Sequence, residues 1–389
     1  MLIAMLLVTA GLLVLILGGE ALVAGAQGVS ERLSIPPMVV GLTIVAFATS
    51  VPELCVSIIA ARAGSPEIAV GNILGSNIFN TLMVIGVAVV LTQRSRSVTS
   101  PSTPLWQEGG KGETTKSLVL HNTLYLRELL WCITATILVF VFAWTPKGEA
   151  SVSTIEGFTL LCIMIGIIFW IVRSALMNPQ EVEPEEAEIG AVLSVLAAIT
   201  TVAVWALCDD TSWQHLGCAA AIGWCWWVLS RGESQLGTLT LITLLCVGVW
   251  VLTIGSGMLV DGAQIAATEL GVSEAVVGLT GVALGTSAPE LATTVVAVKR
   301  GELDMAIGNA LGSNLFNILM VLGIAAIIQP IPVAPRFLEI DAPFALGSLV
   351  ILGLFAKGSL GGGGRGKLTE THGWIMIASW LGYLCTMQS

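Results

Sequence analysis

Two glutamates lie where an ionised carboxylate is least expected in a protein. Glu53 and Glu290 are deep inside long apolar runs of the sequence, and no Lys, Arg or His lies at a similar depth to neutralise them. A carboxylate in such surroundings is strongly unfavourable unless it is compensated. Two carboxylates that face each other also repel, so that one takes up a proton unless a cation binds between them. The pair therefore predicts a cation site.

Each glutamate closes the same short motif, Thr-Ser-x-Pro-Glu, at 49–53 and again at 286–290. Proline inside a helix removes a backbone hydrogen bond and clashes with the carbonyl four residues earlier, so the carbonyl oxygens of Ala48 and Gly285 are predicted to be free. Irregular backbone of this kind is tolerated in a membrane where it lines a polar cavity. A single copy would be interpreted as a kink that shapes packing, but two copies beside buried glutamates favour a site.

A second motif, Gly-Ser-Asn-x-x-Asn, occurs at 75–80 and at 312–317. Its Ser and its second Asn are four residues apart and share one helix face, from which their oxygens can reach a cavity. The candidate ligands from this motif are Ser76, Asn80, Ser313 and Asn317. The other asparagines are expected to form hydrogen bonds between helices; these are Asn72, Asn77, Asn309 and Asn314. Because all the candidate ligands are oxygens, the site suits hard cations such as Ca²⁺, Mg²⁺ or Na⁺.

Both motifs belong to a longer internal repeat. Residues 18–86 align with 255–323 at a constant shift of 237 without a gap, and 34 of the 69 aligned positions are identical. Similarity of this length indicates that one ancestral unit was duplicated within the chain. The two copies of each motif are therefore predicted to face a single cavity.

The composition of the chain is that of a membrane protein. Of its 389 residues, 55% are apolar and only 11% are charged, whereas soluble domains are about a quarter charged. About ten to twelve apolar runs approach the roughly 20 residues that a helix needs to cross a bilayer. The first run, from Met1 to Val29, follows no basic segment and is expected to be a retained spanning helix rather than a signal peptide. The predicted fold class is an all-α polytopic membrane protein.

The distribution of basic residues predicts which way each run faces. With the loops assigned to alternate sides of the membrane, the 16 Lys and Arg residues divide thirteen to three, and the richer side is expected to be cytoplasmic. Both termini then lie on the other side. The helices that carry the glutamates are the second and the ninth crossing, so the two copies are predicted to be inverted. Inverted repeats place a substrate site near the bilayer midplane, between the copies.

The chain is expected to divide into three parts. They are a first inverted repeat at 1–177 (core motif 18–86, polar cytoplasmic loop 93–125), an acidic loop with an extra hairpin at 178–235, and a second inverted repeat at 236–389 (core motif 255–323). Without the extra hairpin, whose spanning part would be 188–230, the number of crossings is ten. The modest size and the lack of a targeting segment favour the inner membrane of a prokaryote.

Several other classes of protein are disfavoured. The chain has no basic cluster interleaved with aromatic residues, which argues against nucleic acid as a partner. No pair of nucleophile and base is recognisable, so an enzyme is not expected, and nothing in the sequence requires a cofactor. The eight Cys are scattered and lack metal-ligand spacing with His, so they are interpreted as packing residues. The indicated partners are the lipid bilayer and the transported ions, and no feature specifies an oligomeric state.

At these motifs the chain resembles the sodium/calcium exchanger family, whose two α-repeats read G-T-S-x-P-E and G-N-x-x-G-S-N. The strong match covers 18–86 and 255–323. The resemblance implies two inverted five-helix halves with four ion sites clustered at the middle. It implies that Ca²⁺ binds between Glu53 and Glu290 with the backbone carbonyls of Thr49 and Thr286. For Na⁺ it implies the same carboxylates with the hydroxyls of Ser50, Ser76, Ser287 and Ser313, the carbonyls of Ala46 and Ala283, and a central ring completed by Asn80 and Asn317.

Three departures from the family pattern matter. Ala48 replaces the glycine that usually precedes Thr-Ser, and the added methyl group at a tight turn is expected to alter affinity. Both ring positions are Asn, whereas members that also need potassium tend to have Asp at the position of Asn317, so potassium dependence is not expected. The family usually has ten crossings, which makes the hairpin at 188–230 an addition.

These observations predict a secondary antiporter that exchanges Ca²⁺ for Na⁺ by alternating access. Two carboxylates carry a charge of about −2, which one Ca²⁺ or at least two Na⁺ offset, while the empty site is a buried dianion that resists crossing. Exchange of Ca²⁺ for H⁺ is the first alternative, since the glutamates can carry protons instead. A cation channel is the second, although selective pores are usually symmetric rings around an axis.

Overall fold

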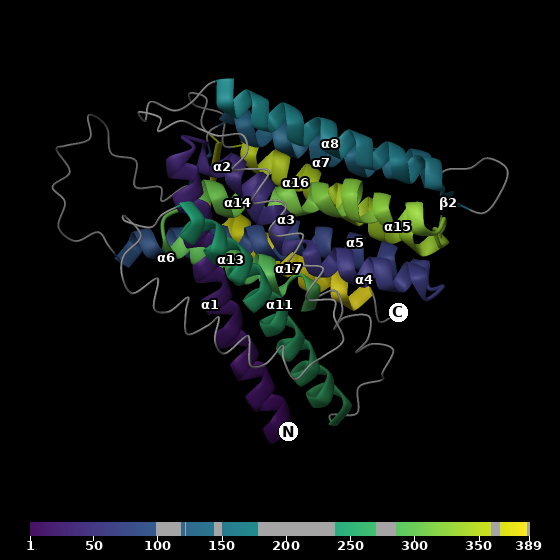
Figure 1. Ribbon diagram of the computed structural model, residues 1–389, viewed down its shortest axis with the longest axis horizontal. Coiled ribbons are helices and arrows are strands. Elements are labelled where there is room, and N and C mark those ends of the chain that lie inside the picture. Colours follow the sequence, from purple (N-terminus) through teal and green to yellow (C-terminus); the bar gives the residue numbers. More distant parts are fainter. Residues whose placement is uncertain are drawn as a thin grey trace.

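The computed structural model describes residues 1–98, 118–120, 122–143, 150–177, 238–269, 285–358 and 366–386. Within these ranges the chain is almost entirely helical, and long helices pack side by side in a bundle (Figure 1). The extra hairpin expected at 188–230 and most of the polar loop expected at 93–125 lie outside the described residues.

The elements of the first half are α1 (Leu2–Arg32), α2 (Pro37–Val40), η1 (Gly41–Val45), α3 (Ala46–Thr49), α4 (Val51–Arg62), α5 (Pro66–Phe79), η2 (Asn80–Val84), α6 (Ile85–Val98), β1 (Leu118–Leu120), α7 (Asn122–Ala143), β2 (Ser151–Val152) and α8 (Thr154–Met177). Those of the second half are α11 (Thr238–Glu269), α13 (Ala288–Lys299), α14 (Leu303–Leu315), η4 (Phe316–Val321), α15 (Leu322–Ile328), β3 (Ile331–Pro332), η5 (Phe337–Asp341), α16 (Ala342–Gly358), β4 (Gly366–Leu368) and α17 (Glu370–Thr386). The elements labelled η are π-helical turns. The short strands pair antiparallel, β1 with β4 and β2 with β3, and so join loops of the two halves.

Many of these helices have the length and composition of membrane spans. In the described part of the chain seven helices are long and apolar enough to cross a membrane, and the bent pair Pro37–Thr49 and Val51–Arg62 adds an eighth. Large apolar side chains such as Leu12, Phe158 and Phe169 are exposed, as a surface that faces lipid requires. The protein is an all-α polytopic membrane protein, as the sequence predicts.

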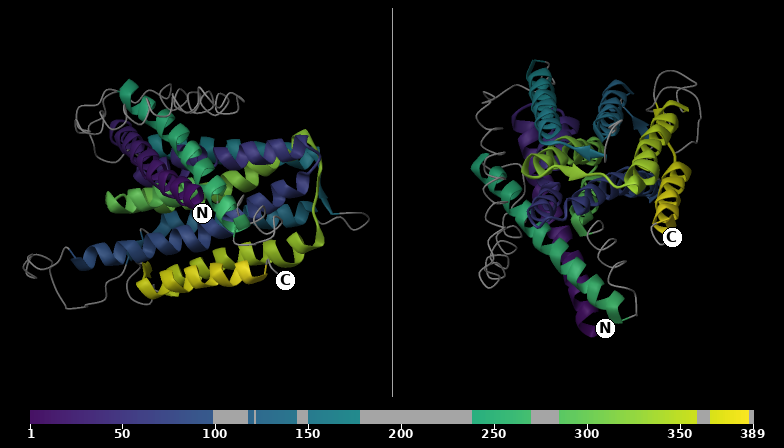
Figure 2. Two further views of the ribbon diagram at one scale, coloured as in Figure 1. Left: turned by 90° about the horizontal axis from the view of Figure 1, so that it is seen from below. Right: turned by 90° about the vertical axis from the view of Figure 1, so that its right-hand side faces the viewer.

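The long helices α1 and α11 lie against each other along their length (Figures 1 and 2). Glycines recur every seven residues, at 11, 18 and 25 in α1 and at 248, 255 and 262 in α11. A Cβ atom at Gly18 would lie 2.8 Å from the backbone nitrogen of Leu252, and one at Gly248 would lie 2.7 Å from that of Leu22. Because these positions carry no side chain, the two backbones approach closely.

The same glycines show the relative direction of the repeats. Gly11 faces Leu259 whereas Gly25 faces Leu245, so α1 and α11 run antiparallel. Positions 11, 18 and 25 correspond to 248, 255 and 262 at the repeat shift of 237. Equivalent helices of the two copies therefore point in opposite directions, and the prediction of inverted repeats is confirmed.

At the centre of the bundle, α14 of the second half packs directly on the α2–α3 segment of the first half. A Cβ atom at Gly308 would lie 2.5 Å from the carbonyl oxygen of Met38, and one at Gly312 would lie 2.4 Å from that of Leu42. Small residues four positions apart thus permit close contact between helices. This contact brings the second motif of one half against the broken helix of the other.

Candidate ion-binding site

The helix that carries each Thr-Ser-x-Pro-Glu motif is broken at its serine. The backbone of Ser50 (φ −83°, ψ 3°) leaves the helical conformation between α3 and α4, where the chain bends by 41°. Ser287 has nearly the same conformation (φ −92°, ψ 4°) before α13. Pro52 and Pro289 then lie in the first turn of the following helix, where the missing N–H of proline is not needed. In the first copy the break separates two helical segments, α3 and α4, and in the second copy it precedes α13.

The break sets the position of both glutamates. Glu53 lies in the first turn of α4 and Glu290 in the first turn of α13. At this end of a helix the dipole favours negative charge. Both side chains are 0% exposed, so each carboxylate is held at the positive end of a helix in the interior of the bundle.

Hydrogen bonds between the halves are reciprocal at this place. The hydroxyl of Thr49 donates to Oδ1 of Asn309 over 3.1 Å, and the hydroxyl of Thr286 donates to Oδ1 of Asn72 over 3.0 Å. Thr49 is the repeat equivalent of Thr286, and Asn72 is that of Asn309. The halves thus meet in an approximately two-fold arrangement around the broken helices.

Glu53 accepts hydrogen bonds from both halves. Its Oε1 lies 3.2 Å from the hydroxyl of Ser287 and 3.4 Å from that of Ser76. Its Oε2 has no partner among the described residues. One side of this carboxylate is therefore held by hydroxyls, and the other is available to a ligand.

Glu290 is less well satisfied than its repeat equivalent. Its side chain lies beside Thr49 and Ser313 and close enough to Glu53 for the two carboxylates to interact. Within the described part of the chain neither of its carboxylate oxygens accepts a hydrogen bond. The two equivalent residues therefore lie beside equivalent side chains but differ in the hydrogen bonds that they accept.

Asparagine side chains also link the halves. Nδ2 of Asn317 donates to Oδ1 of Asn77 over 3.0 Å, and Nδ2 of Asn77 donates to the carbonyl of Asn314 over 3.2 Å. Nδ2 of Asn314 in turn donates to the hydroxyl of Thr81 over 2.8 Å. These are the bonds between helices that the sequence predicts for Asn77 and Asn314. Asn80 has no described partner for either of its side-chain atoms.

Several buried oxygens near the glutamates lack a hydrogen-bond partner among the described residues. Among them are Oγ of Ser50, Oε2 of Glu53, both carboxylate oxygens of Glu290, and Oδ1 of Asn80 and Asn317. Each such atom costs about 1–3 kcal/mol when nothing binds it. None of the ion pairs between described residues includes either glutamate. Unpaired oxygens beside two carboxylates are the type of ligand that hard cations take in proteins.

The predicted ligands lie on four pieces of helix from the two halves. They are Ala46, Thr49, Ser50 and Glu53 on α3–α4, Ser76 and Asn80 on α5–η2, Thr286, Ser287 and Glu290 at α13, and Ser313 and Asn317 on α14–η4. Ala283 lies outside the described residues. The carbonyl of Ala46 accepts the backbone N–H of Ser50 over 3.0 Å. The roles of these residues as ion ligands stay predictions.

The expectation that the carbonyl of Gly285 is free is wrong. The hydroxyl of Ser256, in α11, donates a hydrogen bond to that carbonyl, and so replaces the N–H that Pro289 lacks. Ser256 lies outside both motifs, and its repeat equivalent is Gly19. The repeat therefore contains no signal for this contact, which arises where α11 packs on the broken helix.

The chain is similar to known proteins over most of its length. The chain matches the family described as "Sodium/calcium exchanger protein" over residues 3–173 and 240–388. It is 30% identical to the "Putative antiporter CaxA" of Alkalimonas amylolytica, with 98% of each chain covered. It is 28% identical to the "Inner membrane protein YrbG" of Escherichia coli (strain K12), again with 98% of each covered. The "Sodium/calcium exchanger MaX1" of Methanosarcina acetivorans is 26% identical, with 89% of each covered.

Among solved structures, the chain is similar to that of the sodium-calcium exchanger NCX_Mj soaked with 10 mM Na⁺ and zero Ca²⁺. The TM-score is 0.69 at 22% sequence identity, and the similarity covers 99% of this chain and 98% of that one. The two chains therefore share a fold across both halves.

Proposed function

The chain belongs to the sodium/calcium exchanger family, and we propose that it is a secondary antiporter that exchanges Ca²⁺ for Na⁺. It is an integral membrane protein that transports ions, not an enzyme, and its family exchanges cations that include Ca²⁺. Na⁺ as the counter-ion, and alternating access at a single site near the bilayer midplane, are the parts that we propose.

The observation that carries the proposal is the pair Glu53 and Glu290. They come from opposite halves, both are fully buried, and three of their four carboxylate oxygens lack a hydrogen-bond partner among the described residues. One Ca²⁺ offsets their combined charge, and so do two Na⁺. If both carboxylates stay ionised, the empty pair is an uncompensated dianion in the membrane interior, and movement of the empty site between the two faces is unfavourable. The transporter would then exchange ions rather than leak.

In this proposal Ca²⁺ lies between the carboxylates of Glu53 and Glu290, with the backbone carbonyls of Thr49 and Thr286. Na⁺ uses the same carboxylates together with neutral oxygens. Those are the hydroxyls of Ser50, Ser76, Ser287 and Ser313, the carbonyls of Ala46 and Ala283, and the side chains of Asn80 and Asn317. The hard, oxygen-only character of the set supports Ca²⁺ and Na⁺ over softer metals.

The proposal extends to the membrane and to the organisation of the chain. The protein would lie in the inner membrane of a prokaryote with both termini outside the cytoplasm, since thirteen of its 16 basic residues fall in loops on the opposite side. The halves would be 1–177 and 236–389, joined by an acidic loop and an extra hairpin.

The test is uptake of calcium-45 into proteoliposomes loaded with sodium, compared with potassium loading, at equal internal and external pH. Uptake that requires internal sodium is the expected result. Uptake that does not depend on sodium but follows an imposed pH gradient would instead assign H⁺ as the counter-ion. That result would not contradict the two-glutamate site. Single-channel currents would contradict the antiporter and identify a cation channel.

A further inference from the structure

Two threonines one turn beyond Glu290 have buried hydroxyls without partners. Thr293 and Thr294 follow the glutamate on α13 by three and four residues, so both lie near its face of the helix. Their side chains are 1% and 0% exposed. Neither hydroxyl has a hydrogen-bond partner among the described residues. The Nδ2 atom of Asn309, on the adjacent helix α14, also lacks a partner among them.

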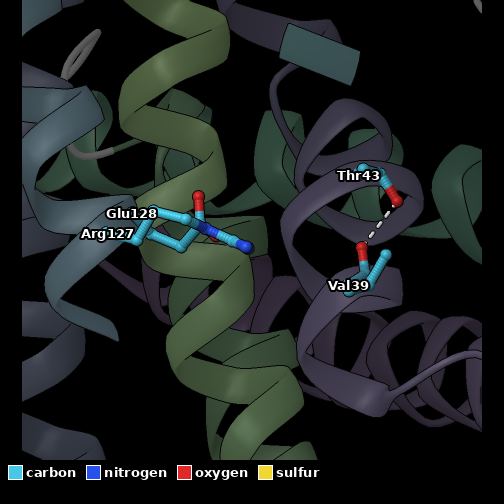
Figure 3. A network of polar contacts seen from close by, with 4 residues as sticks. All are labelled: Val39, Thr43, Arg127 and Glu128. Carbon is cyan, nitrogen blue, oxygen red and sulfur yellow. Dashed lines mark hydrogen bonds and ion pairs between the residues drawn. The ribbon is translucent and has the colours of Figure 1, made fainter. Parts of the chain in front are cut away.

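Seven other helical threonines among the described residues behave differently. Their hydroxyls donate to the carbonyl four residues earlier, as Thr43 does to Val39 over 2.6 Å (Figure 3). The same bond is made by Thr9, Thr92, Thr136, Thr159, Thr253 and Thr268. A buried hydroxyl without a partner is unfavourable, and this local bond is the usual way in which a helix satisfies it. The hydroxyls of Thr293 and Thr294 therefore lack the bond to their own helix that these other threonines make.

The equivalent turn of the first half lacks this feature. Thr293 corresponds to Val56, which has no hydroxyl, and Thr294 corresponds to Ser57. Oγ of Ser57 accepts a hydrogen bond from Nδ2 of Asn72 over 3.4 Å, and Asn72 is the equivalent of Asn309. The same turn can thus be built without unpaired groups, so the packing of the repeat does not require them.

We propose that Thr293, Thr294 and Asn309 form a transit site for a hydrated monovalent cation, one turn from Glu290 toward the Lys299 end of α13. The hydroxyl oxygens can bind the cation or its water, and the amide of Asn309 can donate to that water. The three residues are neutral, whereas protein sites for Ca²⁺ are usually rich in carboxylates. The set therefore suits Na⁺. This inference rests on the proposed function, because it places a step of the Na⁺ path on one side of the central site.

The test measures sodium-dependent calcium-45 exchange in everted and in right-side-out membrane vesicles, with Na⁺ varied at one face at a time. Thr293→Val introduces the residue that the first half has at the equivalent position, Val56, and it preserves the shape of the side chain. We expect the half-saturating Na⁺ concentration at the Lys299 face to rise about threefold to tenfold, because one oxygen contact is lost. The value at the opposite face and the half-saturating Ca²⁺ concentration should not change. Thr293→Ser, which retains the hydroxyl, should restore the wild-type value.

Further variants keep the test decisive. Thr136→Val on α7 removes a hydroxyl that is already bonded to the carbonyl of Cys132 over 2.8 Å, and it should leave the Na⁺ dependence unchanged. Thr294→Val should act like Thr293→Val and serves if the latter does not fold. Wild-type exchange without any sodium dependence would contradict the proposed function itself. Sodium-dependent wild-type exchange with no shift in the folded threonine variants, or with equal shifts at both faces, would overturn the transit site alone.

Discussion

At the scale of single residues, the two glutamates are equivalent in sequence but differ in the hydrogen bonds that they accept. Oε1 of Glu53 accepts hydrogen bonds from Ser76 and Ser287, whereas the oxygens of Glu290 accept none from the described residues. Hydrogen bonds to a carboxylate favour its charged form. Glu290 should therefore depend more than Glu53 on a bound cation for compensation of its charge.

This difference leads to a prediction for the amide variants. Glu53→Gln and Glu290→Gln should each reduce calcium-45 uptake to background, because one carboxylate cannot offset Ca²⁺ by itself in a buried site. Without added Ca²⁺ or Na⁺ the thermal midpoint of unfolding should not fall in either variant, and it should rise more in Glu290→Gln, since the less compensated charge is removed. Added Ca²⁺ should raise the midpoint of the wild type and not that of the variants.

A surface substitution provides the control for this experiment. Glu339 in η5 is exposed, and Glu339→Gln should retain uptake and the stabilisation by Ca²⁺. If both site variants kept calcium flux, the assignment of the glutamates would be wrong.

At the scale of elements, the packing of α1 on α11 depends on the glycines of α11 that face α1, whereas a glycine on another face of α11 has no close neighbour. A Cβ atom at Gly255 would lie 2.8 Å from the backbone nitrogen of Leu15, while one at Gly257, two residues later on the same helix, would meet no described atom within 4 Å. Gly255→Ala should therefore reduce the free energy of unfolding by about 1–3 kcal/mol. Gly257→Ala should be neutral or stabilise by up to about 1 kcal/mol, since alanine favours a helix. Thermal unfolding of the purified protein in detergent checks both, and equal effects would contradict the packing.

The contact of α11 with the broken helix makes a separate prediction. Ser256→Ala leaves the carbonyl of Gly285 without its donor, which should cost about 1–3 kcal/mol and increase hydrogen exchange in the segment that begins at Gly285. Ser256→Thr should restore protection. Ser379→Ala on α17, whose hydroxyl bonds to its own helix at an exposed position, is the control. Unchanged exchange in Ser256→Ala would show that the serine does not hold this segment.

At the scale of the whole molecule, the sequence predicts the structural features that both copies of the repeat share. It does not predict the contacts that only one copy makes. The broken helices and the positions of the glutamates follow from residues present twice, and the inverted arrangement follows from the odd difference in crossing number between the copies. The ion pair of Glu20 with Arg300, 2.7 Å apart, could not be predicted, because Gly257 and Ala63 stand at the equivalent positions. The hydrogen bond of Ser256 to Gly285 could not be predicted either, because Gly19 stands at the position equivalent to Ser256. Such contacts depend on which helices become neighbours, and motif spacing does not contain that information.

The stoichiometry of exchange is also a property of the whole molecule. The family resemblance implies four clustered ion sites, so we expect more than two Na⁺ to move for each Ca²⁺. One Ca²⁺ entering a sodium-loaded vesicle would then be accompanied by net loss of positive charge. An inside-positive potential should therefore increase uptake of calcium-45, and 100 mV acting on one charge corresponds to about 2.3 kcal/mol, or roughly a 50-fold change in the Ca²⁺ ratio at equilibrium. Potassium gradients with valinomycin set the potential, and the same gradients without valinomycin are the control. Uptake that does not respond to the potential would mean that two Na⁺ leave for each Ca²⁺, so that the charge of the two carboxylates alone sets the stoichiometry.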